Sequence, residues 1–476
     1  MKTDTIAAIA TGMSNSGIGI IRISGEDAFQ IADKIFYGNG GKKKLSEVES
    51  HTVHYGHIVD LLDEKNSDTS ETSNRNIVDE VMVSVFHSPR SYTTEDTVEI
   101  NCHGGVLMVN RILELCLKAG ARLATPGEFT KRAFLNGRID LSKAEAVIDI
   151  IHSKNEFALK NSVHQLKGSV SNAVKKMREE IIYEIAFIES ALDDPEHISL
   201  DGYLDTLSVK IDDLVGRIKT LIDSADNGKM MKEGINTVIV GKPNAGKSSL
   251  LNLLVGQDKA IVTDIAGTTR DVLEESIKLH GIGLNIIDTA GIRNTDDIVE
   301  KIGVEKARKY ALEADLVIYV VDSSVPLDEN DKEIIGIVKE ENKKCIALLN
   351  KTDLESVVTE EMIVESFDGL DITIIKTSTK ENSGIDVFEH AIKDMFFTGE
   401  IEMDTEVCIT NMRHKEALID AYESLKLVKG SILDEMPEDF LSIDLMSAYA
   451  SLGAIIGEEV GEDLVNEIFS KFCMGK

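Results

Sequence analysis

The first 118 residues mix two hydrophobic patterns. Apolar runs at residues 18–23 and 81–86 predict strands, and apolar positions at helical spacing over 105–119 predict a helix. Between them, residues 63–76 (DEKNSDTSETSNRN) are polar and carry no apolar periodicity. Because strand-like sequence resumes at Ile77, we interpret this segment as a surface loop inserted within one domain.

Helical spacing of apolar residues then dominates two separate stretches. It covers residues 141–192 and continues to about residue 222. It returns over residues 416–429 and 441–472. Two helical blocks are therefore expected to flank a central block, residues 231–398.

The central block alternates short apolar runs with helical segments. A helix is predicted at 247–254, and strands are predicted at 235–240, 316–321, 345–349 and 372–375. Residues 285–288 are predicted to end a further strand. Alternation of this kind is typical of a parallel sheet with helices on both faces. The chain is thus expected to combine α/β and all-α parts.

The composition limits the possible partners. The chain has 476 residues, enough for two to four domains, and its 51 basic and 83 acidic residues give a formal net charge of −32. This charge excludes a protein that wraps nucleic acid with a basic surface. One stretch, residues 121–178, is positive, with 11 basic and 5 acidic residues. It is either a solvated helix face or a local site for phosphates.

Targeting and redox features favour a cytoplasmic protein with no membrane partner. No apolar run reaches membrane-spanning length, and the N-terminus does not resemble an export signal. Five cysteines occur without a Cys-x-x-Cys pair, so neither a disulfide framework nor a zinc ribbon is expected. Cys102 and His103 are adjacent but have no further ligand nearby, and we interpret them as part of a turn.

Residues 241–248 (GKPNAGKS) match the phosphate-loop pattern between a predicted strand and a predicted helix. The glycines let backbone N–H groups approach phosphate oxygens, and the helix N-terminus adds partial positive charge. Lys247 is expected to reach the terminal phosphates, and Ser248 to bind Mg²⁺. The other expected contacts in this loop are Asn244, Ala245, Gly246 and Ser249.

Three further motifs follow the ends of later strands. Residues 288–291 (DTAG) are expected to hold the Mg²⁺ shell and to sense a γ-phosphate. Residues 350–353 (NKTD) are expected to read guanine, because a carboxylate accepts from its N1–H and amino group and adenine cannot make that pairing. Residues 378–380 follow the last strand and are expected to bind the guanine carbonyl. The predicted contacts of these three motifs are Asp288, Thr289, Ala290, Gly291, Asn350, Lys351, Thr352, Asp353, Ser378, Thr379 and Lys380. Four ordered motifs predict GTP binding.

The switch region follows the usual GTPase pattern, but the residue that positions water in Ras-type enzymes is missing. Residues 264–271 (DIAGTTRD) occupy the switch position, and Thr269 is the candidate second Mg²⁺ ligand. Ras-type enzymes place a Gln after the DxxG motif to orient the attacking water, but Ile292 stands here and cannot do so. Glu300 is either a substitute that positions water or an ordinary surface glutamate.

Other motifs point to one family. Residues 126–146 contain PGEFT, RAFLNGR and AEA, the phosphate loop continues as PNAGKSS, and the chain ends in Cys-Met-Gly-Lys. With these motifs the whole chain, residues 3–476, resembles the MnmE (TrmE) family of tRNA-modification GTPases. The resemblance implies a folate-binding, aminomethyltransferase-like domain that dimerises, a discontinuous helical domain and an inserted GTPase domain. The folate-binding domain is expected to cover residues 1–118, the helical domain residues 119–230 and 399–476, and the GTPase domain residues 231–398.

The resemblance also implies a reaction and its partners. Family members form homodimers and work with a flavoprotein similar to MnmG (GidA), which carries FAD and uses NADH, in an expected heterotetramer. Together they add a carboxymethylaminomethyl or aminomethyl group at carbon 5 of the wobble uridine of certain tRNAs. The carbon comes from a tetrahydrofolate derivative, 5-formyl- or methylene-tetrahydrofolate. Two alternatives stay open: a ribosome-assembly regulatory GTPase, and a free-standing folate-dependent aminomethyltransferase.

The family's folate contacts match four positions: Arg22, Glu99, Arg138 and Lys476. A carboxylate suits the amide-and-amine edge of a pterin, and basic groups suit its oxygens and glutamate tail. Cys473 matches a family cysteine near the folate and is either a catalytic thiol or a packed helix-end residue. Residues 12–17 (GMSNSG) depart from the family's PPGRGG, so that loop's contacts are not implied.

Potassium accounts for the missing Gln. Family members fix a K⁺ ion when two GTPase domains meet, and the ion offsets charge in the transition state. Asn244, Thr263, Ile265 and Thr268 match its ligands, and Glu300 matches a water-positioning residue. The implied catalytic residues are Glu300, Arg270, Asp288 and Cys473, and the nucleotide-contacting switch residues are Thr263, Asp264, Ile265, Ala266, Gly267, Thr268 and Thr269.

Overall fold

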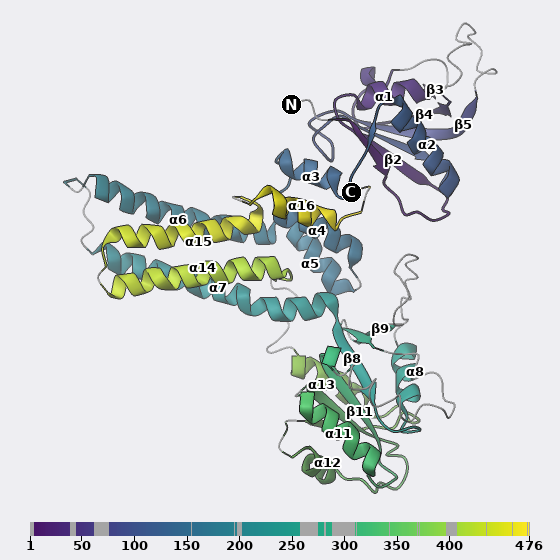
Figure 1. Ribbon diagram of the computed structural model, residues 1–476, viewed down its shortest axis with the longest axis vertical. Coiled ribbons are helices and arrows are strands. Elements are labelled where there is room, and N and C mark those ends of the chain that lie inside the picture. Colours follow the sequence, from purple (N-terminus) through teal and green to yellow (C-terminus); the bar gives the residue numbers. More distant parts are fainter. Residues whose placement is uncertain are drawn as a thin grey trace. The chain divides into compact units, whose positions relative to one another are not determined.

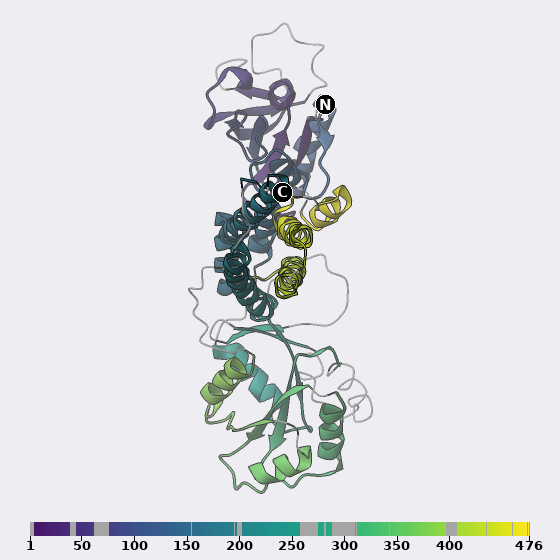
Figure 2. The ribbon, with the colours of Figure 1, turned by 90° about the vertical axis from the view of Figure 1, so that its left-hand side faces the viewer.

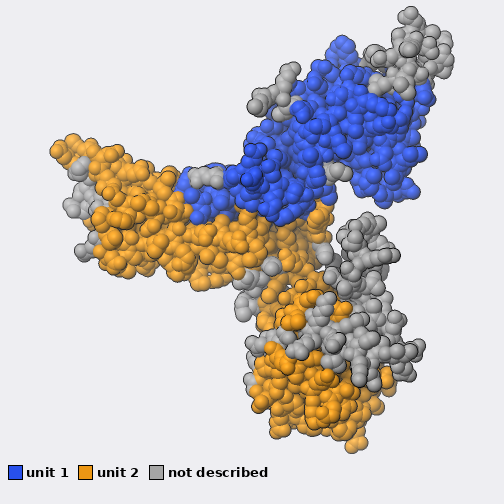
Figure 3. All heavy atoms as spheres, viewed as in Figure 1, with its two compact units in different colours: residues 1–148, 165–180, 449–476 blue, residues 149–164, 181–448 orange. Residues whose placement is uncertain are grey.

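A computed structural model describes residues 4–38, 44–60, 76–153, 155–194, 196–197, 202–257, 275–279, 282–287, 310, 312–341, 343–368, 370, 372–396, 407–434, 436–458, 460–473 and 475. Within these ranges the chain divides into two compact units (Figure 3). The first comprises residues 1–148, 165–180 and 449–476, and the second comprises residues 149–164 and 181–448.

The first unit is built on a seven-stranded sheet of order β3-β4-β5-β6-β2-β1-β7. The strands are β1 (Ile6–Ile9), β2 (Gly19–Ser24), β3 (Phe36–Gly38), β4 (Thr52–Val59), β5 (Ile77–Phe86), β6 (Thr97–Cys102) and β7 (Arg122–Leu123). All described pairings are antiparallel except that of β1 with β7. A short 3₁₀ turn, η1 (Leu45–Glu47), lies between β3 and β4.

Two helices cover one face of this sheet, α1 (Ala28–Ile35) and α2 (Val106–Ala119) (Figure 1). Alternate strand residues such as Ile21, Val83 and Ile100 are fully buried against them. The predicted strands 18–23 and 81–86 and the helix 105–119 are confirmed, although β5 begins four residues earlier. The predicted loop 63–76 lies outside the described residues except for its last residue.

A smaller helical layer completes the first unit. α3 (Glu128–Leu135), the start of α4 (Leu141–His152) and α16 (Glu462–Ser470) enclose a core of Ala133, Leu141, Val465 and Phe469. Gly127 can only be glycine, because a Cβ there would lie 2.5 Å from the carbonyl oxygen of Phe469. The C-terminal segment therefore packs closely on the start of α3.

Long helices form part of the second unit. α7 (Tyr203–Glu233) packs along α14 (Met412–Leu433) within this unit. Three more helices are divided between the two units: α5 (Glu156–Lys167), α6 (Ser169–Asp193) and α15 (Glu438–Ile456). Helix was expected to end near residue 222, and this boundary is wrong by eleven residues. The extension, residues 223–233, carries little apolar periodicity, but Gly228 lets it approach the carbonyl of Ile409 closely.

Among the described residues, one helix is long and apolar enough to cross a membrane, by length and composition alone. Residues Asp439–Ile456 pass that test with a mean hydropathy of 1.3, which corrects the expectation that no stretch would. One face of this helix is buried, through Leu441, Leu445, Ala448 and Leu452. In all, 39% of the segment is buried inside the structure, and Phe440, Ile443 and Met446 are exposed.

The rest of the second unit is a six-stranded sheet of order β13-β12-β11-β8-β10-β9. The strands are β8 (Ile235–Val240), β9 (Glu275–Leu279), β10 (Ile282–Ile286), β11 (Leu316–Asp322), β12 (Lys344–Asn350) and β13 (Thr373–Lys376). All described pairings are parallel except β9 with β10, as the alternating pattern predicts. The expected strand end at 285–288 falls at Ile286.

Helices cover both faces of this sheet (Figure 2). α8 (Lys247–Gln257) and α13 (Ile385–Phe396) pack on one face, where Leu250 and Phe388 are fully buried. α11 (Glu329–Glu341) and α12 (Glu360–Phe367) pack on the other, where Phe367 is buried beside Tyr319. The loops that follow β8, β12 and β13 all leave the same edge of the sheet, which is where ligands bind in folds of this kind.

Candidate functional site

The phosphate loop lies between β8 and α8 and depends on two glycines. Gly241 has φ +150°, and a Cβ there would lie 2.3 Å from the carbonyl oxygen of Val320. Gly246 has φ +105°, and its Cβ would lie 2.1 Å from Nδ2 of Asn350. Any side chain would force the loop away from β11 or from Asn350. The loop can therefore hold this shape only with glycine at both positions.

Lys247 lies at the start of α8 with its ammonium group turned back over the loop. Its Nζ donates to the carbonyl oxygens of Gly241 and Lys242, each at 2.6 Å. Burial lowers the pKa of Lys247 to about 8. A partly buried amine with no carboxylate partner among its described contacts is suited to an incoming anion such as a phosphate.

The guanine motif lies at the end of β12 and touches the phosphate loop. Asn350 donates from Nδ2 to the carbonyl of Ala245 at 2.9 Å, and its Oδ1 accepts from the Thr379 N–H at 3.1 Å. Lys351, held at φ +66°, pairs with Asp322 at 2.5 Å. Residues from the loops that follow β8, β12 and β13 thus meet at one edge of the sheet.

Asp353 is held ready to accept hydrogen bonds. The Ser378 hydroxyl donates to its Oδ1 at 2.8 Å, and Lys380 lies 3.6 Å from its Oδ2. The Ser378 hydrogen bond is the main cause that holds the pKa of Asp353 below its usual value. Thr352 braces the same turn by donating twice to the carbonyl of Thr377. A fixed, ionised carboxylate at this place suits the paired donors of a guanine edge.

Several predicted nucleotide contacts lie outside the described residues. They are Thr263, Asp264, Ile265, Ala266, Gly267, Thr268, Thr269, Arg270, Asp288, Thr289, Ala290, Gly291 and Glu300. Of the predicted ion ligands, Ser248 lies in the first turn of α8. Asn244 lies in the phosphate loop with φ +63°.

A second cluster, in the first unit, gathers the residues predicted to bind folate. Arg22 on β2 is the register partner of Glu99 on β6, and its Nε donates to Oε1 of Glu99 at 2.8 Å. Arg22 also donates to the carbonyl of Gly475 at 3.3 Å. The C-terminal tail therefore reaches Arg22, while Lys476 lies outside the described residues.

Tyr92 joins this cluster, and sequence reasoning missed it. The guanidinium carbons of Arg138 and Arg22 lie 4.6 and 5.1 Å from the centre of its ring, and its hydroxyl bonds Thr130 at 2.9 Å. An aromatic face between two cations stabilises both. Nothing in the spacing of the sequence indicated the contact, because Tyr92 is 70 residues from Arg22 and 46 from Arg138.

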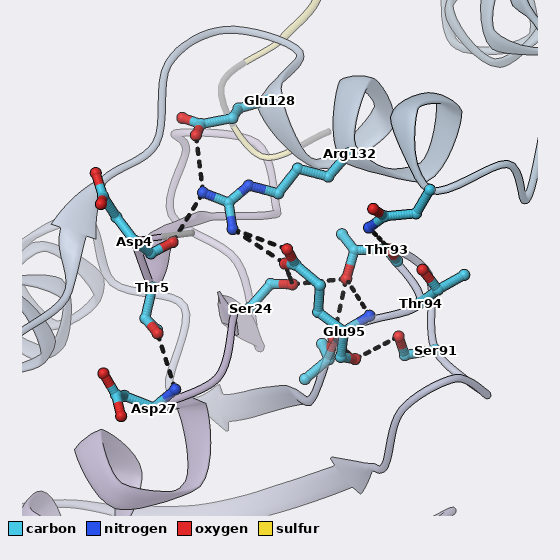
Figure 4. Close-up of polar contacts among 12 residues, drawn as sticks. Asp4, Thr5, Ser24, Asp27, Ser91, Thr93, Thr94, Glu95, Glu128 and Arg132 are labelled. Carbon is cyan, nitrogen blue, oxygen red and sulfur yellow. Dashed lines mark hydrogen bonds and ion pairs between the residues drawn. The ribbon is translucent and has the colours of Figure 1, made fainter. Parts of the chain in front are cut away.

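The loop that carries Tyr92 is fixed by a buried ion network (Figure 4). Arg132 donates to both carboxylate oxygens of Glu95, at 3.0 and 3.1 Å, and to Glu128 at 3.1 Å. The Ser24 hydroxyl also donates to Glu95, at 2.8 Å. Since Arg132 lies in α3 and Glu95 just before β6, the network ties α3 to the sheet beside the cluster.

Two cysteine predictions concern this unit. The thiol of Cys473 is exposed, and the Gly127 N–H donates to its backbone carbonyl at 3.2 Å, so the residue is anchored through its main chain. Cys102 is buried at the end of β6, while His103 bonds Asp79 through both its N–H and its ring. Among the described residues no three His, Cys, Asp or Glu side chains form a metal-binding group.

Comparison with known families and proteins identifies the chain's relatives. A family model described as the MnmE helical domain matches residues 141–473, and one described as the GTP-binding protein TrmE N-terminus matches residues 5–138. The chain belongs to the MnmE family. The tRNA modification GTPase MnmE of Lachnoclostridium phytofermentans is 58% identical over the full length of both chains.

A further MnmE protein and the G domain of a solved transporter are also similar to the chain. The tRNA modification GTPase MnmE of Staphylococcus epidermidis is 46% identical over the full length of both chains. Among solved structures, the G domain of the T. maritima FeoB iron transporter is similar over 34% of this chain and 97% of its own, with 30% identity and a TM-score of 0.25. Full-length similarity to MnmE proteins confirms the predicted family and the multidomain architecture.

Proposed function

We propose that the chain binds and hydrolyses GTP with Mg²⁺, and that hydrolysis serves tRNA modification. The observation that carries the proposal is the meeting of Lys247, Asn350 and Asp353 at one edge of the parallel sheet. The Lys247 ammonium can bind phosphate and the Asp353 carboxylate can bind guanine, so their presence in one site supports a guanine nucleotide as the ligand. Full-length similarity to proteins named tRNA modification GTPase supports the tRNA role.

The hydrolytic step needs ions that this chain's residues would hold. Ser248 and Thr269 would bind Mg²⁺ and Asp288 would support its ligand shell, and the ion would offset negative charge on the phosphates. Asn244 with Thr263, Ile265 and Thr268 would hold K⁺ when two GTPase domains meet. Arg270 and Glu300 complete the proposed catalytic set, with Glu300 positioning water. The family resemblance supports these roles.

The Arg22 cluster is the proposed binding site for a tetrahydrofolate derivative. The pairing of Arg22 with Glu99, and the position of Arg138 at Tyr92, place a carboxylate and two cations around an aromatic ring. A pterin with a glutamate tail offers complementary groups to each. Lys476 and the Cys473 thiol would complete this site, with Cys473 as a candidate nucleophile.

The proposed organisation follows the same family. Residues 1–118 would form the folate-binding and dimerisation domain, 119–230 with 399–476 the helical domain, and 231–398 the GTPase domain. The sheet face opposite α1 and α2 exposes Val53, Tyr55 and Met82, which supports a homodimer through this domain. An FAD- and NADH-dependent flavoprotein similar to MnmG would be the second partner, and the cytoplasm the location.

GTP hydrolysis measured in KCl and in NaCl tests the proposal. K⁺-dependent pairing of two GTPase domains predicts faster hydrolysis in KCl, with a specific rate that rises with protein concentration. Equal rates in both salts at all concentrations would contradict the role of K⁺. No hydrolysis in either salt would contradict the enzyme itself.

A further inference from the structure

Lys242, the second residue of the phosphate loop, makes contacts that no nucleotide motif requires. Its Nζ lies 2.6 Å from Oδ2 of Asp331 and 3.1 Å from Oδ2 of Asp328, both at the start of α11. The side chain of Lys242 is only 12% exposed, and that of Asp331 only 1%. A loop residue is thus tied to a helix that supplies none of the predicted nucleotide contacts.

Asp331 is itself fixed from several directions. Its Oδ1 accepts from the buried Tyr319 hydroxyl at 2.9 Å, and its Oδ2 accepts from the Asp328 N–H at 2.9 Å. Oδ1 of Asp328 in turn accepts from the Asp331 N–H at 3.3 Å, which makes a reciprocal cap on α11. The carboxylate that holds Lys242 therefore belongs to a rigid joint between β11 and α11.

The backbone of Lys242 shapes the site that its side chain never touches. Its carbonyl oxygen is one of the two that accept from the Lys247 ammonium, at 2.6 Å. The same carbonyl accepts from the Ala245 N–H at 3.3 Å, across the turn of the loop. A movement of Lys242 would therefore change both the aim of Lys247 and the curvature of the phosphate cradle.

We propose that Lys242, held by Asp331 and Tyr319, is a positioning residue that sets the phosphate loop in its binding shape. The proposal rests on the proposed nucleotide site and goes beyond it, because it assigns affinity for phosphate to a joint outside that site. Loss of the contact between Lys242 and Asp331 lowers the affinity for the diphosphate group and leaves the guanine pocket of Asn350 and Asp353 intact.

The test compares two ligands that share the base. A fluorescent GDP analogue measures binding to the full chain, and ligand-observed NMR measures binding of guanosine, which has no phosphate. For Lys242→Met we expect GDP binding to weaken at least tenfold and guanosine binding to stay within twofold of the unsubstituted chain. Lys242→Arg, which can still reach both carboxylates, should restore GDP binding to within threefold.

One control variant and one further test variant separate this effect from general damage to the fold. Lys332→Met removes a lysine–glutamate pair on the same helix, where Lys332 and Glu329 are both exposed, and should change neither affinity. Tyr319→Phe removes only the hydroxyl that supports Asp331 and should weaken GDP binding about threefold. Tyr319→Phe therefore tests the proposal if Lys242→Met does not fold.

Unchanged GDP affinity in Lys242→Met would overturn the proposal, and so would unchanged GDP affinity in Tyr319→Phe if Lys242→Met does not fold. An equal loss of guanosine binding, or no recovery of GDP binding in Lys242→Arg, would also overturn it. Failure of the unsubstituted chain to bind GDP would instead contradict the nucleotide site itself.

Discussion

Asn350 donates a 2.9 Å hydrogen bond to the carbonyl of Ala245, and this bond joins the guanine-reading loop to the phosphate loop. Asn350 is almost fully buried and also accepts from Thr379, so both ends of its amide are used inside the site. The two halves of the nucleotide site are consequently held in a fixed spacing. A nucleotide that contacts both loops must match this spacing.

Base choice is expected to depend on Asp353. Asp353→Asn replaces a carboxylate that accepts two hydrogen bonds with an amide that can donate one. Guanine then loses a partner at its N1–H or amino group, whereas xanthine gains a donor for its second carbonyl. We expect GTP binding to fall by at least a hundredfold and xanthosine triphosphate binding to rise, measured by competition against fluorescent GDP. Retained preference for GTP would contradict the assigned role of Asp353.

The lowered pKa of Lys247 predicts a pH dependence of nucleotide binding. Below pH 8 the ammonium is charged before phosphate arrives, but above pH 8 each binding event must take up a proton. Affinity for GDP should therefore be flat up to pH 8 and then weaken by up to about tenfold per pH unit. Titrations at pH 7, 8 and 9 measure this, with Lys247→Met as the control for titration of the base. Equal slopes in both proteins would count against the assignment.

The Arg22 cluster predicts separate sites for folate and nucleotide. Arg22→Met removes the partner of Glu99 and the bond to the C-terminal tail, so 5-formyltetrahydrofolate binding should weaken at least tenfold, with GDP binding unchanged. Isothermal titration measures both ligands on one sample. Lys118→Met, which breaks only an exposed pair with Glu114, is the matched control. Equal folate affinity in Arg22→Met and Lys118→Met would refute the site.

Acid stability should depend on Glu128. Burial alone would raise its pKa, but hydrogen bonds from Arg122, the Thr125 N–H and Arg132 lower it to about 2. Because the pKa in the folded state lies below the unfolded value, the contribution is complete above pH 4.5 and is lost as pH falls toward 2. It amounts to about 3 kcal/mol as an order of magnitude. Glu128→Gln should lower the melting temperature at pH 7 and flatten its decline below pH 4.5; an unchanged acid profile would show that another group dominates.

Much of the fold could be predicted because its patterns are local. β8 coincides with the predicted strand 235–240, and Gly241 and Gly246 stand where backbone geometry permits no side chain. Helix α7 was predicted too short, since residues 223–233 are held by close packing at Gly228 and not by an apolar stripe.

The contacts within the candidate sites were harder to predict from the sequence than the fold was. Their motifs named Lys247, Asn350 and Asp353, but spacing along the chain could not show that Asn350 bonds Ala245 or that Lys242 is tied to Asp331. Tyr92 was missed for the same reason, because it lies in the loop before β6 and contacts Arg22, which is distant in the sequence.

Mass spectrometry of tRNA nucleosides from cells that lack this gene is the most direct test of a role in wobble-uridine modification. We expect loss of carboxymethylaminomethyl- and aminomethyl-uridines, restored by the intact chain but not by its Arg22→Ala, Arg270→Ala or Asp288→Ala variants. An unchanged nucleoside profile would contradict the proposed function and favour a regulatory GTPase such as a ribosome-assembly factor.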